Sequence, residues 1–95
     1  MALFVLINND KPNGLALRMA TRAAHLAYVG GFGDQVKLGG PVLDDNGDMA
    51  GSVILFEAET IEEARNFSAN DPYMKAGLFV QSQVLAFRMS VQNLV

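Results

Sequence analysis

The sequence predicts an α+β fold whose elements follow the order β-α-β-β-α-β. Segments 2–7 and 78–89 are rich in apolar, β-branched and aromatic residues, which is typical of buried strands. Helical patterns begin after the turn residues 10–14 and again at the Thr60–Glu63 motif. This order is that of the ferredoxin-like fold, in which two helices cover one face of a four-stranded antiparallel sheet.

The composition indicates one domain, residues 1–95, with more apolar residues than a small monomer needs. Of the 95 residues, 51% are hydrophobic and 18% are charged, against averages of about 45–50% and about 25%. This surplus predicts a second buried surface, most simply a subunit interface. The net charge of −3 and the absence of a basic run argue against nucleic acid as a partner.

Residue types that are missing exclude several classes of site. The chain has no cysteine and one histidine, so a dedicated transition-metal site is not expected. It has no glycine-rich phosphate loop, and we expect no cofactor. The apolar N-terminal stretch is too short for a signal peptide, and no segment approaches the roughly 20 apolar residues of a membrane span. We therefore expect a cytoplasmic protein with no membrane partner.

The first helix is expected from Leu15 to about Phe32. The apolar stripe on its helical wheel is formed by Leu15, Met19, Leu26 and Val29. Arg22 falls near the centre of this stripe, where a guanidinium either extends to the solvated rim of the sheet or meets a carboxylate or a bound anion. The glycine-rich segment 30–33 should end the helix through left-handed conformations.

A hairpin is expected next. Its first strand, 36–43, is interrupted by Gly39-Gly40-Pro41, and its second strand covers 52–57. The Gly-Gly-Pro step either lets the backbone approach a ligand or forms a bulge. The loop 44–48 contains the turn signal Asn-Gly. It lacks the terminal glutamate of a calcium loop, so a solvated hairpin is expected there.

The second half of the chain begins with a capping box. Thr60 is the expected N-cap, with Glu63 reaching back to it. The helix should end near Asn70, because the residue before a proline is pushed out of the helical region. Residues 71–77 then form a short turn, which leads into the final strand, and the partner of the extension 90–95 is not evident from the sequence.

Both faces of the predicted sheet are apolar. The first strand alternates Leu3, Val5 and Ile7 with Phe4 and Leu6, and the third and fourth strands show the same feature. An antiparallel sheet with one solvated face should carry polar residues at alternate positions. We therefore predict a homodimer in which two sheets pack face to face and close a dimeric α+β barrel.

His25 is the only histidine, and histidine is the side chain that ordinarily titrates near neutral pH. On the helical wheel it lies beside Arg18, at an edge that should face a cleft for a small molecule. Asp71 is its most plausible partner, although an aspartate before a proline is also a good N-cap. Ser68 and Tyr73 could orient a substrate, or could be packing residues.

These residues resemble the motifs of the YciI-like family in the dimeric α+β barrel superfamily. The resemblance covers essentially the whole chain, and its most specific parts are Arg-x-x-His on the first helix and the Asp-Pro-Tyr segment. The matching motifs are Arg22-Ala23-Ala24-His25-Leu26, Gly39-Gly40-Pro41, Asp71-Pro72-Tyr73 and Ala76-Gly77-Leu78.

The resemblance implies a site centred on His25 and Asp71, with Arg22 beside them. Family members with an assigned reaction resemble cofactor-free lyases or dehydrochlorinases of hydroxylated aromatic rings, and related barrels include muconolactone isomerases. One hypothesis is thus a cofactor-independent lyase or isomerase in which Arg22 or Arg18 binds an anionic group of the substrate. Ser68, Tyr73, Gly40 and Pro41 complete the expected binding residues. The alternative is a non-catalytic, ligand-binding or accessory homodimer, able to assemble further, with a structural His/Asp pair.

Overall fold

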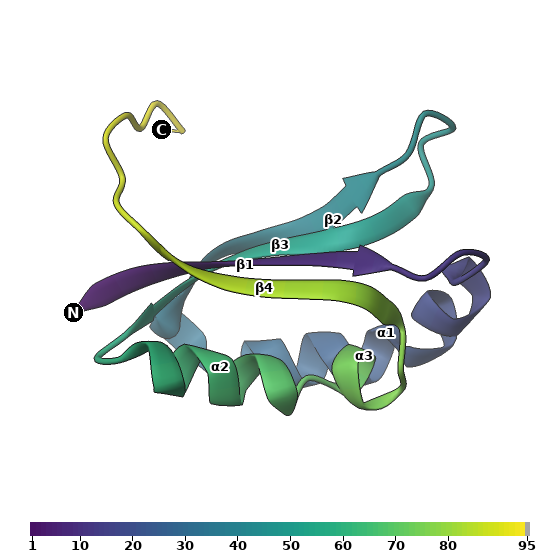
Figure 1. Ribbon diagram of the computed structural model, residues 1–95, viewed down its shortest axis with the longest axis horizontal. Helices are drawn as coiled ribbons and strands as arrows, with labels where there is room; N and C mark the ends of the chain where they lie inside the picture. Colours follow the sequence, from purple (N-terminus) through teal and green to yellow (C-terminus); the bar gives the residue numbers. More distant parts are fainter. Residues whose placement is uncertain (95) are drawn as a thin grey trace.

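A four-stranded antiparallel sheet carries all its helices on one face in the computed structural model, which describes residues 1–94 (Figure 1). The elements are β1 (Ala2–Asp10), α1 (Leu15–Gly30), the 3-10 turn η1 (Gly33–Gln35), β2 (Val36–Leu43), β3 (Met49–Ala58), α2 (Ile61–Ala69), α3 (Pro72–Lys75) and β4 (Phe79–Phe87). The strand order is β2-β3-β1-β4. The predicted βαββαβ fold is confirmed.

The core lies between the sheet and the helices. Phe4 and Leu6 of β1 pair with Phe56 and Ile54 of β3, and all four side chains are buried. Phe67 of α2 stacks on Phe56, with ring centroids 4.3 Å apart. Because side chains alternate along a strand, the same pairing directs the intervening apolar residues to the opposite face of the sheet.

The prediction that the apolar stripe of α1 forms its buried face was wrong. Leu15, Met19 and Leu26 are all exposed, whereas Arg18 is buried. The first half of α1 faces a polar cluster and a cavity instead of the core. Only its last turn packs on the aromatic residues, through partly buried Tyr28 and Val29. Apolar periodicity alone therefore selected a face displaced from the true one.

The end of α1 also differs from the prediction. The helix stops at Gly30, two residues before the expected end, and the cap residue Gly31 keeps right-handed backbone angles. Only Gly33 of this segment has a positive φ, of +56°. It begins the turn η1, which leads directly into β2.

β2 runs without interruption through the Gly-Gly-Pro step. Gly39 pairs with Ile54 and Pro41 pairs with Ser52, while the register shifts fall on either side, at Val36/Leu38 and Val42/Leu43. Proline is tolerated because β2 is an edge strand with one unpaired side. Of the two alternatives considered for the Gly-Gly-Pro step, the bulge is therefore absent.

The second helical region follows its cap signals. Thr60 caps α2 by accepting a hydrogen bond from the Glu63 amide at 3.3 Å. The capping box predicted that the Glu63 carboxylate would accept a hydrogen bond from the amide of Thr60. It accepts one from the amide of Glu59 instead. α2 ends at Ala69 with Asn70 as its C-cap, as expected.

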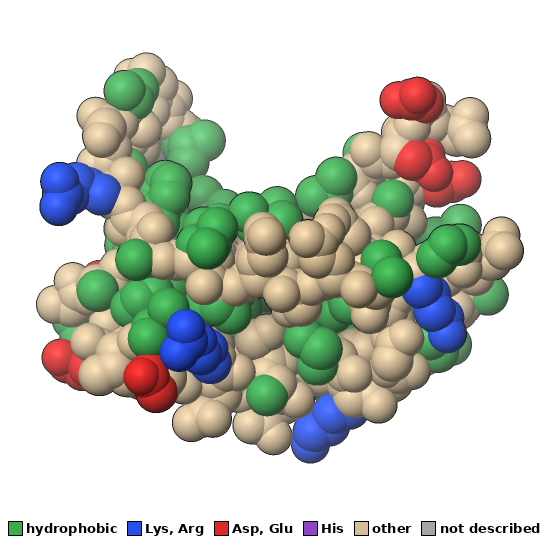
Figure 2. Space-filling view, in the orientation of Figure 1, with side chains coloured by type: hydrophobic (Ala, Val, Ile, Leu, Met, Phe, Trp, Pro, Cys, Tyr) green, Lys and Arg blue, Asp and Glu red, His purple; other side chains and the backbone are tan. Residues whose placement is uncertain are grey.

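The sheet face opposite the helices is concave and apolar. Figure 2 shows hydrophobic side chains along its floor, between the rising C-terminal segment and the β2–β3 hairpin. A depression of about 500 Å³ lies there between the sheet and segment 89–94.

None of the helices described in residues 1–94 is long and apolar enough to cross a membrane.

Candidate active site

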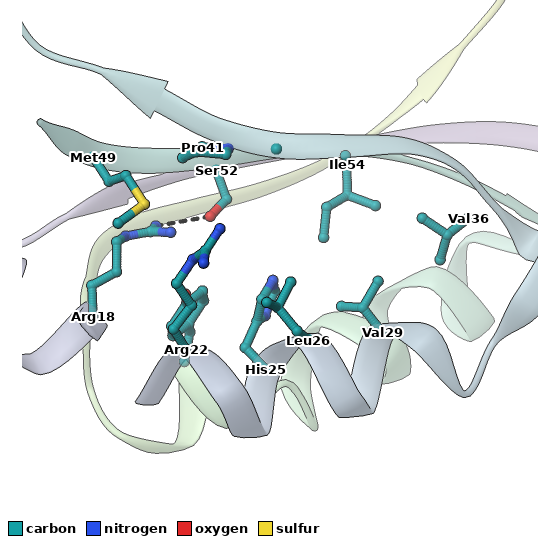
Figure 3. A pocket seen from close by; sticks show the side chains of 13 residues that line it. Arg18, Arg22, His25, Leu26, Val29, Val36, Pro41, Met49, Ser52 and Ile54 are labelled. Atoms are coloured by element: carbon teal, nitrogen blue, oxygen red, sulfur yellow. Dashed lines mark hydrogen bonds between the residues drawn. The ribbon is translucent and has the colours of Figure 1, made fainter. Parts of the chain in front are cut away.

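A cavity of about 130 Å³ lies between α1 and the β2–β3 strands (Figure 3). Its walls come from α1, from the Gly-Gly-Pro step of β2, from β3 and from Tyr73 of α3. Cavities of roughly 150 Å³ hold one benzene ring. The space is therefore suited to a molecule of about one ring.

His25 projects from α1 into this cavity, and Asp71 holds its ring. The imidazole Nδ1 lies 2.9 Å from Asp71 Oδ1 and 3.0 Å from Oδ2. An ionised carboxylate only accepts hydrogen bonds, so Nδ1 carries the proton and donates it. In the neutral imidazole, Nε2 is then left with a lone pair, which is the arrangement of a general base or acid.

Asp71 performs both of the roles considered for it. Besides its contact with His25, its Oδ1 accepts a hydrogen bond from the Tyr73 amide at 2.9 Å and so caps α3. The cap fixes the carboxylate at the start of a short helix, and the carboxylate in turn fixes the imidazole. Because α3 lies beside α1 (Figure 1), residues 46 positions apart meet.

Tyr73 is buried between His25 and Arg18. Its ring stacks on the imidazole at a centroid distance of 4.0 Å and an angle of 16°, and the Arg18 guanidinium lies 4.5 Å from the centre of the same ring. Burial raises the pKa of the Tyr73 hydroxyl, and the charges of Arg18 and Arg22 oppose this only in part. The uncharged Tyr73 ring therefore fixes the orientation of the imidazole plane by stacking on it.

Arg18, which is only 2% exposed, is engaged in an internal ion pair. Its Nε and one terminal nitrogen donate to the two carboxylate oxygens of Asp10, at 2.7 and 2.9 Å, and it also donates to Ser52 Oγ at 2.8 Å. Burial alone would lower the pKa of Arg18, but the hydrogen bonds and charge of Asp10 outweigh it and raise the pKa. The ion pair considered for Arg22 thus belongs to Arg18.

Arg22 is exposed, and its guanidinium points into the cavity near Ser52 in Figure 3. Within residues 1–94 it forms no hydrogen bond or ion pair with another side chain. A cation without an acidic partner at the wall of a small cavity can bind an anionic ligand.

The other expected binding residues divide into two groups. Gly40 and Pro41 line the cavity through β2, beside His25 and Tyr73. Ser68 does not, because it lies on the side of α2 that faces β4 and borders a separate depression with Ser82. The expectation that Ser68 contacts the same ligand was therefore wrong.

Sequence reasoning missed Asp10 and Ser52. Asp10 was interpreted as part of a turn, yet it is the last residue of β1 and pairs with Arg18. Ser52 was interpreted as the start of a strand, yet its buried side chain lines the cavity. A signal was present in the strand pattern, since Ser52 and Asn8 are polar residues opposite each other on the face that carries the core.

A solved structure with the same fold is an enzyme with a small ring compound bound. The structure of 5-chloro-2-hydroxyhydroquinone dehydrochlorinase (TftG) from Burkholderia phenoliruptrix AC1100, in complex with 2,5-dihydroxybenzoquinone, matches this chain with a TM-score of 0.84 and 38% identity. The match covers 90% of this chain and 93% of that one.

Curated relatives match over almost their whole length. Protein YciI from Escherichia coli O6:H1 is 33% identical over 94 residues, covering 90% of this chain and 96% of its own. An uncharacterised protein from Haemophilus influenzae is 29% identical over 93 residues, with coverages of 90% and 95%. The YCII-related domain matches residues 2–88. The chain therefore belongs to the YCII-related family.

Proposed function

We propose that the protein is a cofactor-independent enzyme that moves protons on a small oxygenated ring compound, as a lyase or isomerase. The observation that carries the proposal is the geometry of His25. Asp71 binds Nδ1 at 2.9 Å, and the imidazole lines a cavity of single-ring size. This arrangement supports general acid–base chemistry through Nε2.

The proposed reaction begins with proton transfer from a ring hydroxyl to Nε2 of His25. Asp71 stabilises the imidazolium that forms, and Arg22 stabilises the negative charge on the ring oxygen. Nε2 then returns the proton to a ring carbon, which completes an isomerisation to the ketone. On a chlorinated hydroquinone, the carbon that takes the proton is the one that bears chlorine. Chloride then leaves with the electrons of its bond as a second hydroxyl gives its proton to the freed Nε2, and the sum is loss of HCl.

The dehydrochlorinase neighbour supplies the substrate for a direct test. We expect catalytic amounts of the protein to accelerate chloride release from 5-chloro-2-hydroxyhydroquinone under anaerobic conditions, or tautomerisation of related hydroxylated rings without chlorine. Chloride and the ultraviolet spectrum of the quinone report the first reaction, and exchange of ring hydrogen for deuterium in D₂O reports the second. Rates equal to those in buffer across this panel would contradict the proposal.

Replacing Asp71 with Asn should lower the turnover rate by roughly 10²- to 10⁴-fold. The new amide places an N–H donor against Nδ1, which favours the tautomer with its proton on Nε2 and removes the base. Two-bond ¹⁵N NMR correlations of the only imidazole should show the proton on Nδ1 in the wild type and on Nε2 in Asp71→Asn. An unchanged tautomer with lost activity would mean that Asp71 acts in another way.

The second candidate is a non-catalytic ligand-binding or accessory protein. It is favoured by the structural role of Asp71, because one carboxylate both caps α3 and binds His25 of α1. On this hypothesis the Asp71→Asn protein loses thermal stability while ligand affinity stays unchanged. Acceleration of any ring reaction by the wild type would exclude it.

We further propose that two copies pack through the concave sheet face to form a dimeric α+β barrel. Leu38 of β2 and Leu85 and Phe87 of β4 lie on this face with 40–46% of their surface exposed. Large exposed apolar patches usually mark interfaces, and a twofold contact between identical faces closes without further growth.

A charge on that face should separate the two copies. Leu85 pairs with Val5 of the central strand β1, so Leu85→Glu would place an unpaired carboxylate inside the interface. Light scattering after size exclusion should then show the mass of one chain instead of two. Val80→Glu, on an exposed residue at the start of the same strand, is the control and should remain dimeric.

A further inference from the structure

The cavity is polar at one end and apolar at the other, with His25 between them. In Figure 3, Arg22 and Ser52 lie on one side of the imidazole, and Ile54, Val29 and Val36 lie on the other. A ligand that fills this space therefore meets opposite chemistry at its two ends.

The polar end offers hydrogen-bond donors. Ser52 Oγ accepts a hydrogen bond from Arg18, which leaves its own hydroxyl proton available. Arg22 brings a full positive charge to the same end. No aspartate or glutamate among residues 1–94 lines the cavity, because Asp71 lies behind His25 and Asp10 is held by Arg18. Such a set of donors is complementary to an oxyanion.

At the apolar end, Ile54 packs closely on β2 at Gly39, which has no side chain. A Cβ built on Gly39 would lie 3.3 Å from Cγ1 of Ile54, on the cavity side of the sheet. Its backbone angle does not require glycine, since Gly39 has no positive φ and pairs regularly with β3. A side chain at position 39 would therefore crowd Ile54 and narrow the apolar end of the cavity, and the turn of the chain does not itself require glycine there.

We propose that the substrate is a single-ring anion that binds end-on. Its one anionic oxygen group contacts Arg22 and Ser52, and its reacting atoms lie beside His25. Its opposite edge is apolar and lies against Ile54, Val29 and Val36, with Gly39 setting the largest substituent that fits. This inference rests on the proposed function because it concerns the same cavity, but equilibrium binding tests it independently of turnover.

Benzoate and its neutral analogue benzamide test the polar end by calorimetry. We expect benzoate to bind at least tenfold more tightly, because a hydrogen bond to a charged group is stronger than one to a neutral group. Arg22→Gln should lower benzoate affinity about tenfold or more and leave benzamide unchanged. Arg65→Gln is the control, since Arg65 is an exposed residue of α2 that does not line the cavity.

Para-substituted benzoates test the apolar end. A 4-methyl group should raise affinity about fourfold, which is the usual gain from burying one methyl group. Gly39→Val should abolish this gain, and Gly39→Ala should reduce it, while both variants still bind benzoate. Binding benzoate shows that these variants fold, so a lost methyl gain reports the cavity and not unfolding.

Two results would overturn the inference. The first is equal affinity for benzoate and benzamide in the wild type, or benzoate binding that is indifferent to Arg22→Gln. The second is a 4-methyl gain that survives Gly39→Val. If instead the binding pattern is as expected and no ring compound is turned over, the end-on ligand stands and the enzymatic proposal fails.

Discussion

His25→Ala is expected to lower the turnover rate by about 10²- to 10⁴-fold while the affinity for anionic rings changes little. Among the described residues that line the cavity, the imidazole alone is held so that it presents an unprotonated nitrogen, because Asp71 occupies Nδ1. Arg22 and Ser52, the proposed anion-binding residues, remain in the variant. A large fall in kcat with a similar KM should therefore separate proton transfer from binding.

Added imidazole provides the matched test of this interpretation. His25→Ala leaves a space beside the face of Tyr73, on which the native ring stacks at 4.0 Å. Free imidazole that enters this space should restore part of the rate, with saturation, whereas it should not accelerate Arg22→Gln. A variant that keeps its rate, or that loses it without any rescue, would contradict a role for His25 as the proton carrier.

The fold was predictable because its signals are local. Strand and helix periodicity, the Thr60 cap and the proline at position 72 each act within a few residues, and together they define the order of the elements. The face of α1 was not predictable in this way. An apolar stripe identifies the buried face only when the helix packs on an apolar core, and the first half of α1 packs on Asp10, Ser52 and the cavity.

The candidate site was predictable only where a residue had few alternatives. His25 is the single histidine, and Asp71 sits in a distinctive Asp-Pro-Tyr segment, so their pairing could be proposed although 46 residues separate them. The choice between Arg18 and Arg22 could not be made, because it depends on which arginine meets Asp10 across the end of β1. The position of α1 relative to the end of β1 decides which arginine it is, and no short-range signal in the sequence specifies that position.

Asp10→Ala is expected to cause the largest loss of stability of any single substitution considered. It would leave the guanidinium of Arg18, 2% exposed, without its carboxylate and with only Ser52 as an acceptor. Breaking a buried ion pair in this way costs about 3–5 kcal/mol. In a domain of this size, each kcal/mol shifts Tm by about 4–8 °C, so calorimetry should show a fall of roughly 12 °C or more.

An exposed ion pair supplies the control. Glu62 and Arg65 are i,i+3 neighbours on α2 at 3.7 Å, with side chains 71% and 59% exposed. Pairs of this kind contribute about 0–1 kcal/mol, so Glu62→Ala should shift Tm far less than Asp10→Ala. Similar shifts for the two variants would mean that burial of Arg18 does not set the energy of its ion pair.

Removing both charges separates the cost of an orphaned cation from the value of the pair itself. The double variant Asp10→Leu/Arg18→Met has no unpaired charge, and replacing a buried ion pair by apolar residues is often neutral or stabilising. Its Tm should therefore recover most of the loss seen in Asp10→Ala. The turnover rate should not recover, because Arg18 also packs against the Tyr73 ring, and that ring orients the imidazole of His25. A double variant that is stable and impaired in kcat would assign the buried pair to positioning rather than to stability.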